Sequence, residues 1–245
     1  MPAAARGELG GLEIMRTTGL GAGTIYPSCG CNRRTVQVIP NSNLAPADCT
    51  RGRDDHFVRI HLESERLVLR ELTVEDVDHL LALDTDPDVA RWSIDPMPCR
   101  EDVEQRHLPY FLRLYKESPG YGFWAAEDRT VGTFLGWFHL RPREGHPDDE
   151  PELGYRLRRS AWGRGYATEG SRALIDKAFT ELPVRRVLAE TAGFHVASRR
   201  VMEKSGLRLM REYESSYPPL GPDDILGDVE YAITREEWEQ QRQSS

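Results

Sequence analysis

Residues 162–170 read WGRGYATEG and join two stretches of regular pattern. Residues 152–157, before this stretch, predict a β-strand. The residues after it predict an amphipathic helix, because one face repeats at spacings of three and four and carries Ser171, Leu174, Ile175, Ala178, Phe179 and Leu182. Glycines allow a tight turn and a close backbone approach, and the first N–H groups of a helix lack intrahelical partners. A strand, a glycine-rich turn and a helix therefore predict an anion site.

Two standard phosphate motifs do not fit this turn. Gly163-x-Gly165 lacks the third glycine of a dinucleotide fingerprint, because Thr168 occupies that position. The run GYATEG is followed by Ser-Arg, whereas a nucleotide P-loop requires Lys-Ser or Lys-Thr. The turn thus predicts a phosphate-bearing ligand without naming it, and a plain strand-to-helix connection remains the alternative.

Three blocks of the sequence resemble the GNAT N-acyltransferase superfamily. The turn is similar to its acyl-CoA signature, Gln/Arg-x-x-Gly-x-Gly/Ala, with Gly165 and Ala167 at the last two fixed positions. Trp162 stands at the Gln/Arg position, as in the branch that acetylates the N-termini of ribosomal proteins. Residues 195–207, HVASRRVMEKSGL, resemble the family's Asn-x-Ala-Ser-x-Arg-Val-x-Glu-Lys-x-Gly-Phe block. Residues 230–238, EYAITREEW, resemble its closing strand and tail, so the resemblance covers roughly residues 64–240.

The chain is predicted to form one α/β domain with an extension. Its 245 residues are 39% hydrophobic and 29% charged, which suits one sizeable core. The resemblance implies a mixed, mostly antiparallel central sheet with helices on both faces, over residues 57–240. Residues 1–56 are rich in glycine and proline and predict a low-order N-terminal extension, or a segment upstream of the working start codon. Residues 241–245 form a tail.

The pattern of apolar residues and turn residues predicts the order of the elements within this domain. A capping box at residues 73–76 predicts the start of the first helix, and Pro109 predicts a kink or break in the second. Gly206 predicts the end of a short helix. The expected strands are 66–70, 122–126, 133–140, 152–157, 185–191, 207–213 and 228–233, with a further short strand at 35–39, and the expected helices after the first are 101–116, 171–182 and 197–205.

Composition excludes several classes of partner. No run of about 18 apolar residues predicts a membrane span, and the first residues lack the apolar segment of a signal peptide, so we expect a cytoplasmic protein without a membrane partner. A formal net charge of −8 argues against nucleic-acid binding and suits a cationic partner. The cysteines lack the spacing of a zinc site or a disulfide framework, so we expect no metal; they are Cys29, Cys31, Cys49 and Cys99.

The resemblance implies acetyl-CoA as co-substrate and assigns residues to hold it. The pyrophosphate would lie on the backbone of the turn, at Gly163, Arg164, Gly165, Tyr166, Ala167 and Thr168. The pantetheine arm would pair with the preceding strand, at Arg156, Leu157 and Arg158. His195 replaces the family's usual Asn beside the cofactor. Arg200, with its neighbours Arg199 and Lys204, would meet the adenosine 3′-phosphate, although helix charges of this kind are commonly only solvated.

Acyl transfer to an amine requires a base for the amine and benefits from an acid for the departing thiolate. By resemblance, Glu152 is the predicted base, and a surface strand residue is the alternative reading. His139 is the second candidate, because its ordinary pKa suits proton removal near neutrality. Ser198 is the predicted acid, since Val201 and Met202 replace the tyrosine that many relatives carry there. Water, or a plain helix first-turn serine, is the alternative.

The predicted acceptor is a primary amine. A protein N-terminus is favoured by the resemblance, and a small cationic amine such as an aminoglycoside or polyamine is the alternative. A non-catalytic acyl-CoA-binding module is the third reading. We expect Trp92, Tyr110 and Tyr115 either to line the acceptor site or to lie in the core, and the acidic loop 143–151 either to attract the amine or to be solvated surface. A monomer or homodimer is expected.

Overall fold

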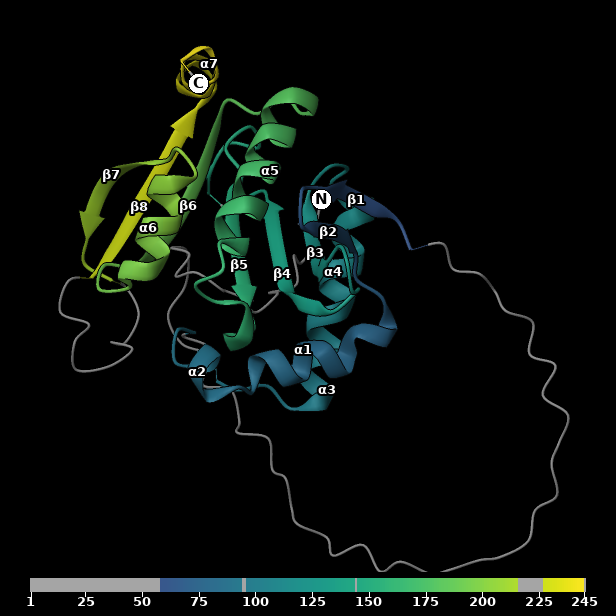
Figure 1. The fold of residues 1–245 in the computed structure, drawn as a ribbon. Coiled ribbons are helices and arrows are strands. Elements are labelled where there is room, and N and C mark those ends of the chain that lie inside the picture. Colours follow the sequence, from purple (N-terminus) through teal and green to yellow (C-terminus); the bar gives the residue numbers. More distant parts are fainter. Residues whose placement is uncertain (1–57, 94–95, 144, 216–226, 245) are drawn as a thin grey trace, which may run out of the picture. The chain divides into compact units, whose positions relative to one another are not determined.

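One sheet of eight strands passes through the domain in the order β1-β2-β3-β4-β5-β6-β8-β7 (Figure 1). The computed structural model describes residues 58–93, 96–143, 145–215 and 227–244. The strands are β1 (Ile60–Glu63), β2 (Leu67–Glu71), β3 (Gly122–Asp128), β4 (Phe134–Arg141), β5 (Glu152–Leu157), β6 (Arg186–Ala192), β7 (Arg208–Tyr213) and β8 (Asp228–Thr234). Neighbouring strands are antiparallel except β5 and β6, which are parallel. The predicted mixed, mostly antiparallel sheet is confirmed, whereas the predicted extension 1–56, with its short strand, lies outside the described residues.

Helices cover both faces of this sheet (Figure 1). They are α1 (Val77–Asp84), α2 (Pro87–Ala90), α3 (Arg100–Asp102), α4 (Leu108–Glu117), α5 (Tyr166–Glu181), α6 (Val196–Lys204) and α7 (Arg235–Gln243). Short turns of other helix types are η1 (Val74–Asp76), η2 (Val103–His107) and η3 (Arg159–Ala161). The predicted break in the second helix lies at η2, a π-helical turn, and α4 resumes with Pro109 in its first turn, where the missing N–H costs least.

Two hydrophobic cores lie on the two faces. On one face, α5 contributes Leu174, Ile175 and Phe179 to a core shared with the strands. Gly170 of α5 faces the Phe138 ring so closely that a Cβ at this position would overlap it. The glycine therefore sets the distance between α5 and the sheet. The second core lies between the sheet and helices α1 to α4, and it includes Leu80, Phe111, Phe123 and Trp137.

Strands β5 and β6 are in register at one residue pair only, Glu152 opposite Leu188. The Leu188 N–H donates to the Pro151 carbonyl at 2.9 Å. Beyond this point the described residues of β5 and β6 no longer pair, and the two strands diverge. Because the strands are parallel, the segments that follow them leave at the same edge of the sheet. The starts of α5 and α6 are therefore brought to the two sides of the gap (Figure 1). This divergence positions the site.

Candidate active site

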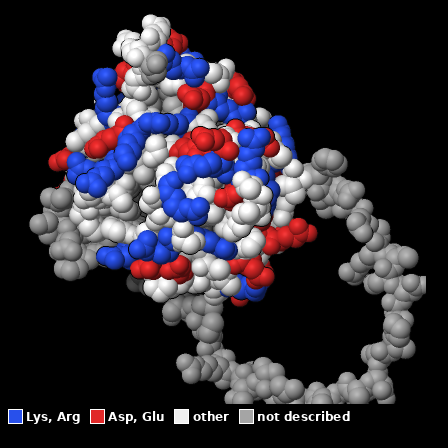
Figure 2. All heavy atoms as spheres, viewed as in Figure 1, with Lys and Arg blue, Asp and Glu red and all other residues white. Residues whose placement is uncertain are grey.

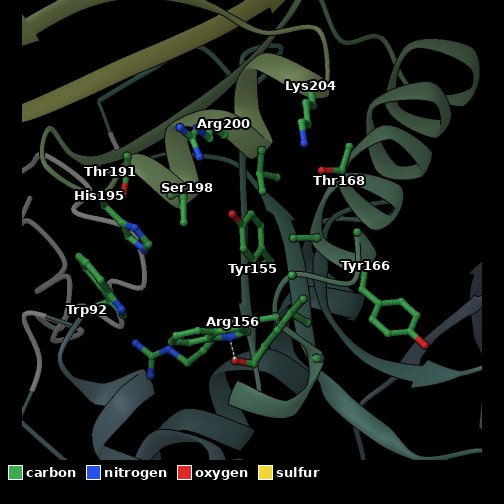
Figure 3. A pocket seen from close by; sticks show the side chains of 18 of the residues that line it. Trp92, Tyr155, Arg156, Tyr166, Thr168, Thr191, His195, Ser198, Arg200 and Lys204 are labelled. Atoms are coloured by element: carbon green, nitrogen blue, oxygen red, sulfur yellow. Dashed lines mark hydrogen bonds between the residues drawn. The ribbon is translucent and has the colours of Figure 1, made fainter.

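A cavity of about 450 Å³ lies where β5 and β6 separate (Figure 3). This volume is typical of small-molecule sites. Strand β5 contributes Tyr155, Arg156 and Leu157, strand β6 contributes Thr191 and Ala192, and the rest of the lining comes mainly from the turn before α5 and from α6. The sequence-predicted residues at the cavity are Trp92, Arg156, Leu157, Gly163, Gly165, Tyr166, Ala167, Thr168, His195, Ser198, Arg200 and Lys204.

The glycine-rich turn has the backbone geometry of an anion cradle. Gly163 and Gly165 have φ angles of 72° and 85°, in the left-handed region that glycine adopts without strain. Gly165 is also the N-cap residue of the 16-residue helix α5, so the first N–H groups of a long helix point toward the turn. Figure 2 shows Lys and Arg side chains over α6 and around the start of α5, in a chain whose formal net charge is −8. Both features favour a phosphate-bearing ligand.

Two side chains of this turn face away from the cavity and fasten it to the sheet. The Tyr166 hydroxyl donates to Asp128 Oδ2 at 2.7 Å, and its ring points outward in Figure 3. Glu169 accepts hydrogen bonds from the Arg66 backbone N–H and the Ser64 hydroxyl, each at 2.7 Å. The Arg164 guanidinium lies over the Tyr166 ring, 5.0 Å from its centroid. These contacts hold the turn in one conformation, so Tyr166 meets the cavity without presenting its phenol to it.

Five residues that the sequence analysis named for catalysis or cofactor binding do not line the cavity: His139, Glu152, Arg158, Arg164 and Arg199. The backbone N–H of Arg158 donates to the Leu135 carbonyl at 2.8 Å, so it continues the pairing of β5 with β4 instead of facing the gap. Glu152 lies on the opposite face of the sheet from Tyr155, because successive residues of a strand point to opposite faces.

Aromatic rings close the end of the cavity opposite Thr168 and Lys204 (Figure 3). The rings of Trp92 and His195 stack with centroids 3.7 Å apart and an interplanar angle of 13°. Burial, and to a smaller degree the charge of Arg91, lowers the pKa of His195 to about 4, so the imidazole is neutral at pH 7.

Of the three aromatic residues predicted for the acceptor wall, only Trp92 lines this cavity. Tyr115 accepts from the Leu72 N–H at 3.0 Å and donates to the Phe123 carbonyl, so it belongs to the core. Tyr110 packs edge-on against the Phe123 ring at a centroid distance of 5.9 Å.

Two hydroxyl groups face the middle of the cavity (Figure 3). Ser198 is buried in the first turn of α6, and the Tyr155 hydroxyl points from β5 toward it in Figure 3. Burial raises the pKa of Tyr155 to about 12, and the neighbouring Ser198 hydroxyl opposes this rise. Tyr155 was missed by the sequence prediction. Strand alternation, which places Tyr155 on the face opposite Glu152, is the signal that could have found it.

Glu152 is fully buried, so its reading as a surface strand residue is wrong. Strand β5 has a neighbour on each side and helices on both faces, which leaves its first residue no access to solvent. The Glu152 carboxylate accepts from Arg141 Nη2 at 3.1 Å and lies 3.9 Å from His139 Nε2. His139 is also fully buried, against the Phe123 ring. Burial, aided by the charge of Arg141, lowers its pKa well below the ordinary value, so its imidazole is neutral.

A second buried carboxylate follows on β6, on the same face as Glu152. Glu190 Oε1 lies 2.8 Å from Arg143 Nη2, which comes from the loop after β4. Burial raises the pKa of Glu190 to about 7, although the charge of Arg143 opposes the rise. Burial also acts to raise the pKa of Glu230 on β8, but the hydrogen bond from Arg211 at 2.7 Å, the charges of Arg211 and Arg143 and the hydrogen bond with Glu190 together lower it. Glu190 was missed, although a glutamate within the apolar run VLAETA was a detectable signal.

The loop predicted as solvated or amine-facing is partly buried. Glu150 is 4% exposed and forms ion pairs with Arg185 and with Arg186, the latter at 2.5 Å. Arg143 is equally buried. The charged side chains of Arg143 and Glu150 therefore lie in the interior, so the prediction that the whole loop 143–151 is solvated surface is wrong.

Within the described part of the chain, no cluster of three or more His, Cys, Asp or Glu side chains has the arrangement of a metal site. The helices of that part are also too short or too polar to cross a membrane.

Comparison with known proteins agrees with this geometry. The profile of the family described as "Acetyltransferase (GNAT) domain" matches residues 66–208. The FsC-acetyl coenzyme A-N(2)-transacetylase of Aspergillus fumigatus is 34% identical over 185 residues, which cover 72% of this chain and 77% of that protein.

Two solved structures share the fold. The ribosomal-protein-S5-alanine acetyltransferase of Vibrio fischeri has a TM-score of 0.61 at 17% identity and covers 72% of this chain and 97% of its own. The spermidine N-acetyltransferase of Vibrio cholerae, in complex with CoA and spermine, has a TM-score of 0.57 at 15% identity and covers 71% of this chain and 99% of its own. The divergent strands, the glycine-rich turn and the family match lead to one conclusion: the chain belongs to the GNAT acetyltransferase family and is an acetyl-CoA-dependent N-acetyltransferase.

Proposed function

We propose that the enzyme transfers the acetyl group of acetyl-CoA directly to a primary amine while both substrates are bound. The observation that carries this proposal is the gap between β5 and β6, with the glycine-rich turn before α5 at one end and the hydroxyls of Ser198 and Tyr155 at its centre. Both substrates can reach such a gap from opposite faces of the sheet. No covalent enzyme intermediate is then needed.

Binding of acetyl-CoA would use the cavity from end to end. The N–H groups between Gly163 and Thr168 would hold the pyrophosphate, and Arg200 and Lys204 line the cavity near it. Because β5 separates from β6 after its first residue, its edge can pair with the amides of the pantetheine arm as an added strand would. The thioester would then lie toward Ser198.

The reaction forms one bond and breaks another. The amine nitrogen attacks the thioester carbonyl carbon, the C–N bond forms, and the C–S electron pair leaves with sulfur. The nitrogen must also lose a proton. Glu152 is our first candidate to accept it, and it would act through a water because it does not line the cavity. Glu190 is the second candidate, since a carboxyl group with a pKa of about 7 suits proton transfer near neutral pH.

The acceptor is proposed to be a cationic amine. Three buried carboxyl groups, Glu152, Glu190 and Glu230, lie on the face opposite α5 and α6. Arg141, Arg143 and Arg211 pair with them, so this face would offer hydrogen-bond acceptors to an ammonium group instead of a net negative charge. The relative that is 34% identical acts, by its name, at N(2) of FsC. The ribosomal-protein and spermidine enzymes share the fold at 17% and 15% identity, which gives less support to their acceptors. We therefore rank FsC first, small polyamines next, and a protein N-terminus after these.

The test is a panel of acceptors with acetyl-CoA, in which free thiol release is followed. The panel contains FsC, spermidine and peptides with an unblocked N-terminal alanine, and product mass spectrometry locates the acetyl group. Turnover with one class and not the others assigns the acceptor. Calorimetric binding of acetyl-CoA without turnover on any amine would support the non-catalytic binding module. Failure to bind acetyl-CoA would refute the proposed function.

A further inference from the structure

We propose that the Tyr155 phenol donates a hydrogen bond to the departing sulfur, and that Ser198 holds this phenol in position. The proposal rests on the acyl transfer proposed above and names the group that acts on the leaving thiolate. It changes the sequence prediction, in which Ser198 alone was the acid.

The position of Tyr155 follows from the strand that carries it. Alternation along β5 places Leu153, Tyr155 and Leu157 on the face covered by α5 and α6. The Phe138 ring of β4 lies beside the Tyr155 ring, with centroids 5.7 Å apart. Tyr155 therefore projects into the cavity at the level where β5 has left β6, and its hydroxyl points toward the first turn of α6 (Figure 3).

The Ser198 hydroxyl is placed to restrain this phenol. Ser198 is 2% exposed and its hydroxyl has no hydrogen-bond partner among the described residues, while the Tyr155 hydroxyl lies near enough for Ser198 to oppose the rise of its pKa. A buried hydroxyl without a full set of partners is costly, at about 1–3 kcal/mol, so the pair is poised to accept a further polar group. The start of α6 adds a favourable field for negative charge on that group.

Other side chains of the cavity are less suited to the sulfur. His195 is neutral and stacked on Trp92, and Val201 carries no proton to donate. Arg156 is held by Asp84, with Nη1 and Oδ1 2.5 Å apart. Thr191, on the wall formed by β6, is the remaining hydroxyl near Ser198 (Figure 3).

The chemistry is hydrogen-bond donation and not full proton transfer. A thiol has an ordinary pKa of about 8.5, whereas Tyr155 has a pKa of about 12. The phenol therefore keeps its proton while the C–S electron pair moves onto sulfur. The thiolate leaves stabilised by the O–H group and takes its proton from water afterwards. Because the phenol stays protonated throughout the working pH range, the donor is always available.

The first test measures the pKa of the CoA thiol bound to the protein, by ultraviolet absorbance of the thiolate across pH. Binding to wild-type protein should lower the pKa of the thiol relative to free CoA. In Tyr155→Phe the pKa of the bound thiol should be higher than in wild-type protein by roughly one to two units, the effect expected from losing one hydrogen bond to a charged acceptor. Ser198→Ala should raise it by less. Tyr121→Phe, which removes a phenol outside the cavity lining, is the matched control and should change nothing.

The second test uses the leaving group. Tyr155→Phe should lower kcat with acetyl-CoA by about 10- to 100-fold, and the loss should shrink with the selenoester analogue, because a selenol is more acidic and needs less stabilisation. The double variant with Ser198→Ala should be no slower than Tyr155→Phe alone, since Ser198 acts through the phenol.

The outcomes separate this proposal from the proposed function. Unchanged thiol pKa values in Tyr155→Phe, with CoA still bound, would overturn the assignment of Tyr155. A full shift in Ser198→Ala or Thr191→Val alone would overturn it in favour of that residue. A shifted thiol pKa with no turnover on any amine would support Tyr155 and count against the proposed acyl transfer. If wild-type protein does not bind CoA, both are wrong.

Discussion

Replacing Glu190 with glutamine tests the electrostatics of the sheet face opposite α5. Glu190 is fully buried, and its carboxylate lies 2.8 Å from Arg143. Glutamine keeps the shape of the side chain but removes the group that titrates. The variant therefore isolates the free energy of ionising a carboxyl group at this position.

The magnitude follows from the pKa. Burial raises the pKa of Glu190 from 4.5 to about 7 on folding, and each unit corresponds to about 1.4 kcal/mol. The folded protein holds this proton to higher pH than the unfolded chain does. The resulting stabilisation is fully present below pH 4.5 and is lost as the pH rises through about 7. The loss amounts to about 3 kcal/mol in wild-type protein and is absent from Glu190→Gln.

The assay is urea denaturation of both proteins between about pH 4.5 and 8.5, read as the free energy of unfolding. The wild-type curve should fall relative to the Glu190→Gln curve by about 3 kcal/mol over this range. A constant difference reports only the lost contact with Arg143. Glu239→Gln, at an exposed position on α7, is the control and should follow wild-type protein at every pH. Parallel curves for wild-type protein and Glu190→Gln would refute the raised pKa, and with it the case for Glu190 as a base near neutral pH.

Three further predictions concern the cavity and the first candidate base. Gly165→Ala should cost about 1–2 kcal/mol of stability because of its left-handed φ, and it should also weaken acetyl-CoA binding in calorimetry. The control Gly132→Ala, at a similar φ in a distant turn, should cost the same stability and bind acetyl-CoA normally. Equal affinities of the two variants would show that the pyrophosphate does not bind at Gly165. Trp92→Ala removes the ring stacked on His195 and should raise the relative kcat/KM for butyryl-CoA by roughly tenfold; an unchanged acyl-chain profile would show that Trp92 does not bound the acyl group. Glu152→Gln should lower kcat by roughly 10²- to 10⁴-fold without loss of acetyl-CoA affinity, and the defect should shrink as pH rises because more amine arrives neutral; wild-type rates at neutral pH would exclude Glu152.

Local patterns were sufficient to predict most elements and the glycine-rich turn before α5. The capping box at Thr73 and the break before Pro109 are confirmed, because caps and proline act within one helical turn. The left-handed glycines before α5 are likewise a local requirement of the strand-turn-helix connection. Gly206, with a φ of 92°, ends α6 as expected.

The rest of the site depends on contacts distant in sequence. The burial of Glu152 follows from strands on both sides, which its own neighbours in sequence do not reveal. Tyr155 gains its importance from the point at which β5 leaves β6, and that point is set by the pairing of whole strands. Glu190 meets an arginine 47 positions earlier in the chain, Arg143, from a loop that reads as surface. The roles of the predicted site residues, the cytoplasmic location and the oligomeric state remain predictions.

The single register pair between β5 and β6 has a mechanical consequence. Strands β1 to β5 and strands β6, β8 and β7 form two halves of the sheet, and the register pair Glu152 and Leu188 joins them. A pantetheine arm that hydrogen-bonds to the open edge of β5 would fill the gap between the two halves of the sheet, so the bound substrate would become part of the folded structure. Ligand at 100 times its dissociation constant adds about 2.7 kcal/mol to stability. The rigidity of the sheet, and the lifetime of the folded enzyme, would then follow the supply of acyl-CoA.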